Sequence, residues 1–123
     1  MAATNSDDVL DAVFDGEILH GLRGNDILNS TYNDTLLFGD DGDDQLVTKF
    51  AYYNFEALAL AAWQYGGLGN DQLTAELGVP SDNSTADINQ YGGLGNDVIK
   101  AYAFIADSYF GDNVTLAINV HGG

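Results

Sequence analysis

A leucine recurs every nine residues through the first part of this chain. The series is Leu10, Leu19, Leu28, Leu37 and Leu46. Two positions before each leucine stands a polar residue, in the order Asp8, Glu17, Asp26, Thr35 and Asp44. An amphipathic helix would need a period of about 3.6 residues, so this spacing excludes a continuous helix. It favours a short structural unit that repeats along the chain.

Glycine-rich segments mark the same unit further along. The octapeptide QYGGLGND occurs at 64–71 and again at 90–97, and less regular copies lie at 21–28 and 39–46. Glycine adopts backbone angles that are barred to residues with a Cβ, and it lets neighbouring turns approach closely. The pattern predicts a flattened spiral in which a six-residue turn alternates with a three-residue strand. Two such units would complete a coil of 18 residues, with the leucines pointing inward.

The spacing sorts the polar residues onto two edges of this spiral. Asp8, Asp26 and Asp44 are separated by 18 residues, one full coil, and are expected along one edge. Glu17 and Thr35 fall on the opposite edge, where the glycines are missing.

The next two aspartates follow after longer steps, of 27 and 26 residues. A step of 27 could be three units, which would switch edges, or one coil with an insertion of nine residues. We prefer the insertion because residues 47–65 contain no recognisable glycine turn. One ladder is then expected, formed by Asp8, Asp26, Asp44, Asp71 and Asp97, with the insertions on the opposite edge.

The insertions are less readable than the repeats. Residues 54–65 fit a short helix between Asn54 and Gly66, and the alternation of Ala with Leu fits a strand equally well. Residues 79–87 contain the only proline and predict an exposed loop. Residues 101–106 predict a strand, and a weak further repeat begins at Gly111.

Composition narrows the classes of function. Nineteen acidic residues against three basic ones give a net charge of −16, which repels nucleic acid and anionic membranes. The 46% of hydrophobic residues argues for a folded domain. No cysteine is present, no stretch is apolar enough for a membrane span, and no N-terminal signal peptide is recognisable.

Glycine turns with one aspartate each suit calcium. Calcium takes six to eight oxygen ligands, many of them backbone carbonyls, and a single turn cannot enclose it. Each ion is therefore expected between two stacked turns. Without it, two carboxylates about 5 Å apart repel by roughly 3 kcal/mol at an effective dielectric constant near 20. We expect a largely unfolded metal-free chain and a β-rich calcium form, with up to four ions along one edge.

The glycine-aspartate turns resemble the calcium-binding nonapeptide repeats of the RTX (repeats-in-toxin) family over residues 3–50 and 64–100. The resemblance implies a parallel β-roll in which backbone carbonyls and the Asp carboxylate bind calcium. Carried over, the metal-binding residues are Gly21, Arg23, Gly24 and Asp26; Gly39, Asp41, Gly42 and Asp44; Gly66, Leu68, Gly69 and Asp71; and Gly92, Leu94, Gly95 and Asp97. Asp8 joins them through the ladder. The resemblance also implies export from a Gram-negative bacterium by a type I system and an extracellular location.

The sequence departs from that family in its long insertions and in lacking a secretion signal after Gly111. We expect residues 1–123 to be a single all-β domain, a parallel β-roll (β-solenoid) with calcium-binding turns and irregular insertions. It would be a fragment of a larger secreted protein, serving as a calcium-dependent folding and structural module.

The alternative is adhesion or carbohydrate recognition, with a glycan or protein partner. The aromatic residues of the insertions motivate it: Tyr52, Tyr53, Phe55, Trp63, Tyr65, Tyr102, Phe104, Tyr109 and Phe110. Catalysis is not expected, because His20 and His121 have no recognisable nucleophile or paired base nearby. The acidic pairs Asp7/Asp8 and Asp43/Asp44 are better explained as metal ligands than as a glycosidase site.

Overall fold

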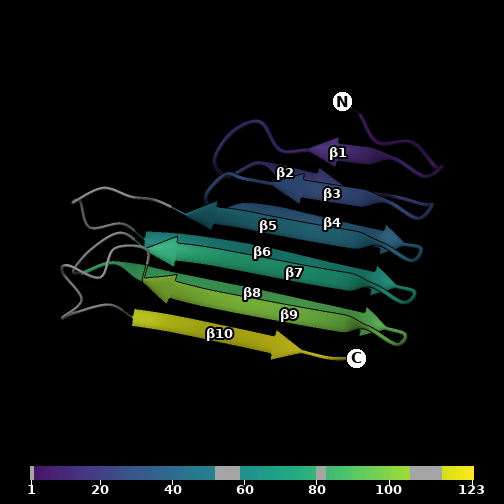
Figure 1. Ribbon diagram of the computed structural model, residues 1–123. Helices are drawn as coiled ribbons and strands as arrows, with labels where there is room; N and C mark the ends of the chain where they lie inside the picture. Colours follow the sequence, from purple (N-terminus) through teal and green to yellow (C-terminus); the bar gives the residue numbers. More distant parts are fainter. Residues whose placement is uncertain (1, 52–58, 80–82, 106–114) are drawn as a thin grey trace.

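The computed structural model describes residues 2–51, 59–79, 83–105 and 115–123, and all regular elements in these ranges are strands (Figure 1). In chain order they are β1 (Val9–Asp11), β2 (Ile18–His20), β3 (Ile27–Ser30), β4 (Thr35–Asp41), β5 (Gln45–Ala51), β6 (Ala59–Leu68), β7 (Gln72–Val79), β8 (Thr85–Leu94), β9 (Val98–Ile105) and β10 (Thr115–His121). The protein is therefore all-β in its described part.

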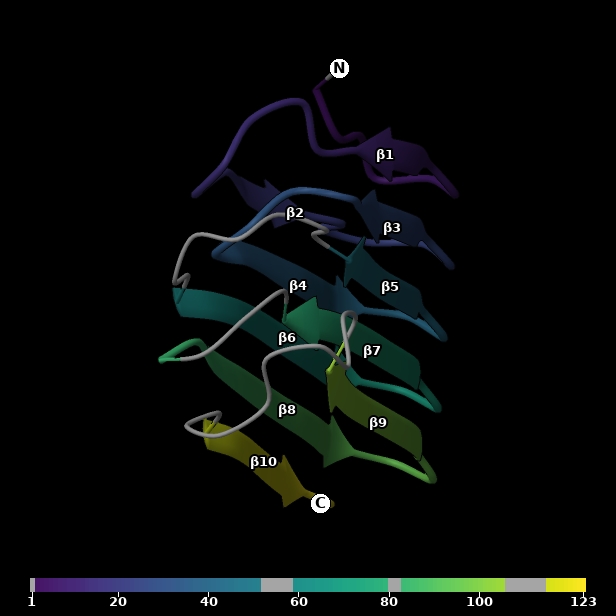
Figure 2. The same ribbon diagram turned by 60° about the vertical axis from the view of Figure 1, so that its left-hand side comes forward.

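The strands form two parallel sheets. The odd sheet has the order β1-β3-β5-β7-β9, and the even sheet has the order β10-β8-β6-β4-β2. All neighbouring strands within each sheet are parallel. The chain alternates between the sheets, so consecutive strands face each other across two layers (Figure 2).

The register decides how the longer steps are accommodated. Ile27 of β3 pairs with Gln45 of β5, Gln45 pairs with Gln72 of β7, and Gln72 pairs with Val98 of β9. All four residues directly follow a ladder aspartate in the sequence. The steps of 27 and 26 residues therefore keep to one edge, as predicted. The alternative, in which three nine-residue units would move the next aspartate to the other edge, is excluded.

The turns lie on two separate edges. Those that lead from even to odd strands contain all the glycine-aspartate segments and lie at the right in Figure 1, and we call this the glycine–aspartate edge. The fully described connections from odd to even strands, residues 12–17 and 31–34, lie on the opposite edge. Residues 52–58, 80–82 and 106–114 fall outside the described ranges.

The structure differs from the sequence expectations in the lengths of the strands and in parts of the three inserted segments. Strands of three residues occur only as β1 and β2, whereas β6 and β8 have 10 residues each, so much of the inserted sequence lengthens strands. The strand interpretation of 54–65 is right from Ala59 onward, and 54–58 lie outside the described residues. The loop expected at 79–87 is too long, because Val79 ends β7 and Thr85 begins β8. The strand expected at 101–106 is confirmed to Ile105, and Gly111 is not described.

The core lies between the sheets. Burial alternates along the strands, as in β6, because successive side chains of a strand point to opposite faces. The inward direction of the repeating leucines is confirmed, since they share one buried cluster: Leu10, Leu19, Leu28, Leu37, Leu46 and Leu73, with Ala12. A second cluster contains Leu60, Ala62, Ala75, Leu77, Val79, Ala86 and Ile88.

Buried glutamines also join the two sheets. The Gln64 side-chain amide donates to Thr48 Oγ1 at 3.2 Å and to the Thr74 carbonyl at 2.9 Å. The Gln90 amide donates to Gln64 Oε1 at 2.8 Å and to the Lys100 carbonyl at 3.0 Å. Because buried polar groups are costly unless paired, these bonds fix the register between the sheets.

The part of the chain that the structure describes contains no helix of the length and apolar character needed to cross a membrane.

The difference in burial between two leucines predicts unequal costs for their truncation. Leu46→Ala removes a side chain that is 0% exposed and should lower the free energy of unfolding by about 2–5 kcal/mol. Leu68→Ala is the control, because this side chain is 49% exposed and its loss should cost no more than about 0.5 kcal/mol. Urea unfolding followed by circular dichroism, with calcium in every sample, measures both. Equal losses would contradict this assignment of the core.

Candidate functional site: aspartates buried between stacked turns

Five aspartates stack along the glycine–aspartate edge. The backbone N–H of each of the first four donates to Oδ1 of the aspartate in the following turn. The distances are 2.7 Å from Asp8 to Asp26, 2.8 Å from Asp26 to Asp44, 2.9 Å from Asp44 to Asp71 and 3.0 Å from Asp71 to Asp97. The structure thus brings together the five residues of the ladder predicted from their spacing.

The second carboxylate oxygen has no partner in four of these residues. Oδ2 of Asp26, Asp44, Asp71 and Asp97 is buried and accepts no hydrogen bond from the described residues. Asp26, Asp44 and Asp71 are at most 2% exposed. An unpaired buried charge is far more costly than an unpaired neutral group. Four such oxygens in one row therefore require a compensating positive charge or protonation.

Glycine at the first position of each turn leaves room beside this oxygen. A Cβ on Gly21 would lie 2.5 Å from both Asp26 Oδ2 and the carbonyl oxygen of Gly39 in the next turn. The same arrangement recurs around Gly39, with Asp44 and Gly66, and around Gly66, with Asp71 and Gly92. A carboxylate and a carbonyl oxygen from successive turns therefore converge in three gaps, each gap being the space between two stacked turns.

Glycine at the fourth position lets the turns stack. Gly42 has a φ of 146°, and a Cβ there would meet the carbonyl group of Gly24 in the preceding turn. Gly69 and Gly95 have φ values of 131° and 140° and approach the preceding turn in the same way. Side chains at these positions would push the turns apart and open the gaps.

A second ladder lies beside the aspartates, and the sequence analysis missed it. The backbone N–H of Asn25 donates to Oδ1 of Asp7 at 2.8 Å, and Asp43 donates to Asn25 at 2.9 Å. Asn70 donates to Asp43 at 2.8 Å, and Asn96 donates to Asn70 at 2.9 Å. This ladder runs in the opposite direction to the first. Its signal is the Asn or Asp that precedes each ladder aspartate in the sequence.

The predicted third-position residues contribute to stacking. The carbonyls of Asp41, Leu68 and Leu94 accept hydrogen bonds from the fourth-position glycine of the preceding turn, at 3.1, 2.8 and 2.8 Å. The Leu68 and Leu94 side chains are 49% and 69% exposed. The Arg23 side chain forms an ion pair with Asp41, with 3.9 Å between Nε and Oδ2. A carbonyl has two lone pairs, so these groups keep one acceptor site after stacking.

Asp8 differs from the other four aspartates. Its carboxylate accepts hydrogen bonds from Thr4, through the backbone N–H at 2.6 Å and the hydroxyl at 2.9 Å. On the opposite edge, Glu17 accepts from the Val13 N–H at 2.6 Å. The Thr35 hydroxyl donates to Ser30 Oγ at 2.9 Å. The side chains of Glu17 and Thr35 thus make their hydrogen bonds on the edge opposite the aspartate row.

Burial raises the pKa of the central aspartates. Removal from water is the main cause for Asp26, Asp44 and Asp71, and repulsion from neighbouring carboxylates adds to it. The pKa of Asp44 rises to about 7. In the metal-free fold, these groups therefore bind protons at a pH at which an exposed aspartate is ionised.

Five aromatic rings stack on the even sheet, one from each strand. Successive centroids are 4.6 Å apart from His20 to Phe38, 4.7 Å from Phe38 to Tyr65, 4.9 Å from Tyr65 to Tyr91 and 4.8 Å from Tyr91 to His121. The rings are within 7° of parallel. Both faces of the three inner rings are covered by their neighbours, so these rings offer only their edges to a sugar.

The remaining aromatic residues behave differently. Trp63 is half-buried and pairs in register with Leu36 and Asn89, and Tyr102 is 55% exposed. Tyr52, Tyr53, Phe55, Tyr109 and Phe110 lie outside the described residues.

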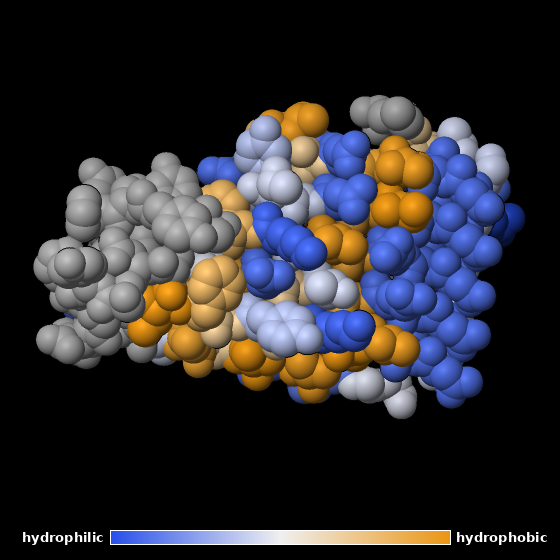
Figure 3. All heavy atoms as spheres, in the orientation of Figure 1, coloured by the Kyte–Doolittle hydropathy of each residue, from blue (hydrophilic) through white to orange (hydrophobic). Residues whose placement is uncertain are grey.

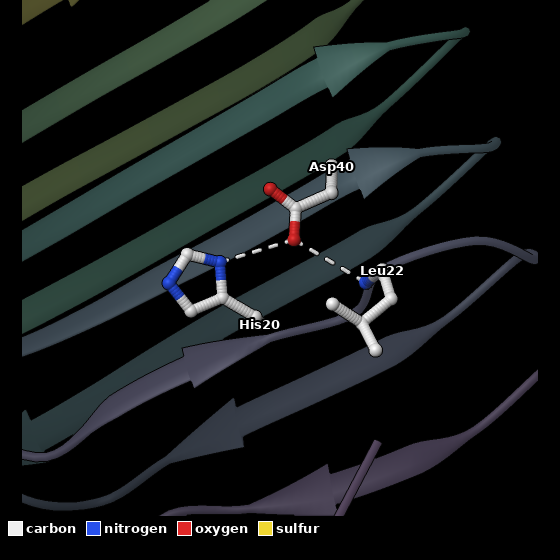
Figure 4. A network of polar contacts seen from close by, with 3 residues as sticks. All are labelled: His20, Leu22 and Asp40. Carbon is white, nitrogen blue, oxygen red and sulfur yellow. Dashed lines mark hydrogen bonds and ion pairs between the residues drawn. The ribbon is translucent and has the colours of Figure 1, made fainter. Parts of the chain in front are cut away.

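His20 also makes a polar contact at the first glycine turn. Figure 4 shows Asp40 Oδ2 between the His20 ring, at 3.1 Å from Nδ1, and the Leu22 N–H, at 3.3 Å. Leu22 and Asp40 have positive φ values of 78° and 74° at the second turn position, where Gly67 and Gly93 stand in the later turns. The Asp40 side chain thus helps to hold a turn whose second residue is not glycine.

Among the described residues, no three histidine, cysteine, aspartate or glutamate side chains form a group that could hold a metal ion by themselves. Hydrophilic residues cover the glycine–aspartate edge, at the right in Figure 3. A cation in a gap would depend on one buried carboxylate and on backbone carbonyls from two turns. Comparison with known proteins gives no match to a family model, a curated protein or a solved structure.

The close stacking of the turns predicts that Gly42→Ala is much more damaging than Gly16→Ala. Both glycines have positive φ, which costs an alanine about 1–3 kcal/mol. Only the Cβ at 42 also meets backbone of another turn, whereas nothing lies within 4 Å of a Cβ at 16. We expect Gly42→Ala to lose most of its β spectrum and Gly16→Ala to keep it. Similar thermal midpoints for the two variants would contradict the stacking role.

The raised pKa values predict how pH affects the metal-free chain. Protonation favours the fold when the folded pKa is above the unfolded value, which is 3.8 for Asp44. Its contribution is present in full below that value and is lost as the pH rises through about 7. Protein dialysed free of metal should therefore have more β structure at about pH 5.5 than at about pH 8, a window in which exposed carboxylates stay ionised.

Asp44→Asn is the matched control for the pH measurement, because it keeps the shape of the side chain and removes its charge. Circular dichroism of this variant should change less over the same pH range. An equal change in both proteins would show that Asp44 does not govern the transition.

Proposed function

We propose that this chain is a calcium-binding module whose folding depends on the ion, built as a parallel β-roll (β-solenoid) of the RTX type. One observation carries the proposal. Four buried carboxylate oxygens without hydrogen-bond partners lie in one row, and in three cases a carbonyl oxygen of the next turn converges on the same space. Hydrogen bonding between successive turns satisfies Oδ1 of the same residues and leaves Oδ2 for a cation.

The donor set suits calcium better than other common metals. Carboxylate and carbonyl oxygens are hard ligands, and calcium accepts six to eight of them in flexible geometry. Magnesium needs a tight octahedron and gives up its waters reluctantly. Zinc and copper prefer nitrogen and sulfur ligands, whereas the chain has no cysteine and the converging atoms are all oxygens.

The three complete gaps define the residues that would hold ions. The first gap lies between turns 21–26 and 39–44, the second between 39–44 and 66–71, and the third between 66–71 and 92–97. Asp97 Oδ2 is also unpaired, but the three atoms nearest to a Cβ on Gly92 all belong to Asp97 itself. We expect three tightly bound ions and a weaker fourth at Asp97.

Calcium would act on stability through these same carboxylates. In the metal-free fold, each is desolvated and faces other acids of the row, and both effects oppose folding at neutral pH. A divalent ion in a gap would attract these carboxylates, so that the electrostatic contribution of the row favours folding and no longer opposes it. Because the gaps exist only when the turns are stacked, the binding free energy becomes folding free energy.

The charge of −16 fits a chain that folds where calcium is abundant, because the ion offsets the repulsion among the acids. We therefore infer a structural module of a larger protein that is secreted, in the RTX manner, by a type I route. The aromatic rings of the even sheet do not favour glycan recognition as a second function, because their faces are engaged with each other.

Calcium titration tests the proposal. At neutral pH the metal-free chain should give the circular dichroism of a largely unfolded protein, and calcium should restore a β spectrum. Magnesium at the same concentration should restore much less. The single tryptophan, half-buried Trp63, gives an independent fluorescence signal of the same transition. A β spectrum of equal strength with and without calcium would refute calcium-dependent folding.

A further inference from the structure

The first turn of the aspartate row, residues 3–8, is stacked like the others. Ser6 and Asp7 lie where the later turns meet each other, within 2.9 Å of a Cβ on Gly24. Asp7 accepts from the Asn25 N–H at 2.8 Å, and the Asp8 N–H donates to Asp26 at 2.7 Å. Both side-chain ladders therefore begin in this turn. Its residues correspond to 21–26 at a spacing of 18.

Thr4 satisfies the carboxylate that is left unpaired in the other turns. Asp8 Oδ2 accepts the Thr4 backbone N–H at 2.6 Å and the Thr4 hydroxyl at 2.9 Å, and the hydroxyl also lies 3.1 Å from Oδ1. The Ser6 N–H donates back to Thr4 Oγ1 at 3.2 Å, which closes the turn. Asp8 is also only half-buried, so its charge keeps contact with water.

Ala3 stands at the turn position that is glycine in all the later turns. At those glycines a Cβ would come within about 2.5 Å of the ladder carboxylate, closer than real Cβ contacts. Ala3 carries this Cβ, and its side chain packs against the leucine core cluster. A methyl group and the arrangement of oxygens found beside Gly21 cannot occupy the same space.

We propose that residues 3–8 form a metal-free copy of the calcium turns, in which Thr4 replaces the ion and Ala3 blocks its position. Asp8 is then a hydrogen-bonding residue of the stack and not a calcium ligand, contrary to the sequence expectation. The ion column begins with Asp26. The first turn supplies both ladders with neighbours for turn 21–26 without an ion of its own. This inference rests on the proposed calcium binding of the later turns.

Ion counting by native mass spectrometry, on the full chain in calcium, tests the assignment. Asp8→Asn should bind as many calcium ions as the wild type, whereas Asp26→Asn should bind one fewer. The two substitutions are matched, because each removes one charge from one ladder position and keeps the side-chain shape. Loss of one ion in Asp8→Asn would overturn the inference. Equal counts for Asp26→Asn and the wild type would overturn it as well.

A gain of binding tests the two blocking residues directly. The double variant Ala3→Gly/Thr4→Gly frees the Asp8 carboxylate and opens its gap, and it should bind one ion more than the wild type. Adding Asp8→Asn to this variant should remove the extra ion. If the folded double variant binds no extra ion, Ala3 and Thr4 are not what excludes calcium. If it does not fold, the comparison of Asp8→Asn with Asp26→Asn still decides.

The outcomes separate this inference from the proposed function. A wild-type chain that binds no calcium would refute the function of the whole row. A wild-type chain that binds calcium and loses an ion in Asp8→Asn would refute only the metal-free first turn. Calorimetric titration of the same variants gives a second count that does not depend on transfer to the gas phase.

Discussion

A buried carboxylate with one paired and one unpaired oxygen is the constraint on which this structure depends. The ladder bonds hold Oδ1 of Asp26, Asp44, Asp71 and Asp97 against the backbone of the preceding turn. The same bonds fix Oδ2 in a space without a donor. The stack can therefore not relax the unpaired charge without giving up its own hydrogen bonds. Proton uptake by Oδ2 and a bound cation are the two ways in which these four residues can keep their ladder bonds without an unpaired buried charge.

The other features of the edge follow from this requirement. Glycines at the first turn position leave space for the oxygens, and those at the fourth let the turns approach. The second ladder of Asn and Asp side chains ties successive turns together independently of the carboxylates in the gaps. Away from the edge, the leucine cluster, the buried glutamines and the aromatic stack depend on the spacing that the turns set. At Asp8, in the first turn, Thr4 supplies the neutral donors that the later aspartates lack.

The repeating parts of the fold could be predicted because each unit shows its inward leucine, its glycines and its aspartate at fixed spacing. The single aspartate ladder followed from that period together with the lack of a glycine turn in residues 47–65. Gln64 and Gln90 belong to the repeated octapeptide, and only the pairing of the sheets shows that they are buried between layers. The segment from Ala59 to Tyr65 has residues that suit a helix, and parallel pairing with β4 and β8 makes it a strand. Asp8 matched the ladder spacing, but its hydrogen bonds to Thr4 depend on the geometry of the turn.

The central claim is that divalent ions lie between the turns, and a crystal structure in calcium tests it most directly. Anomalous diffraction identifies calcium by element and position. We predict peaks about 2.3–2.6 Å from Oδ2 of Asp26, Asp44 and Asp71, each also within reach of a carbonyl of the following turn. Ordered turns with no anomalous peak in these gaps, in crystals grown at saturating calcium, would contradict it.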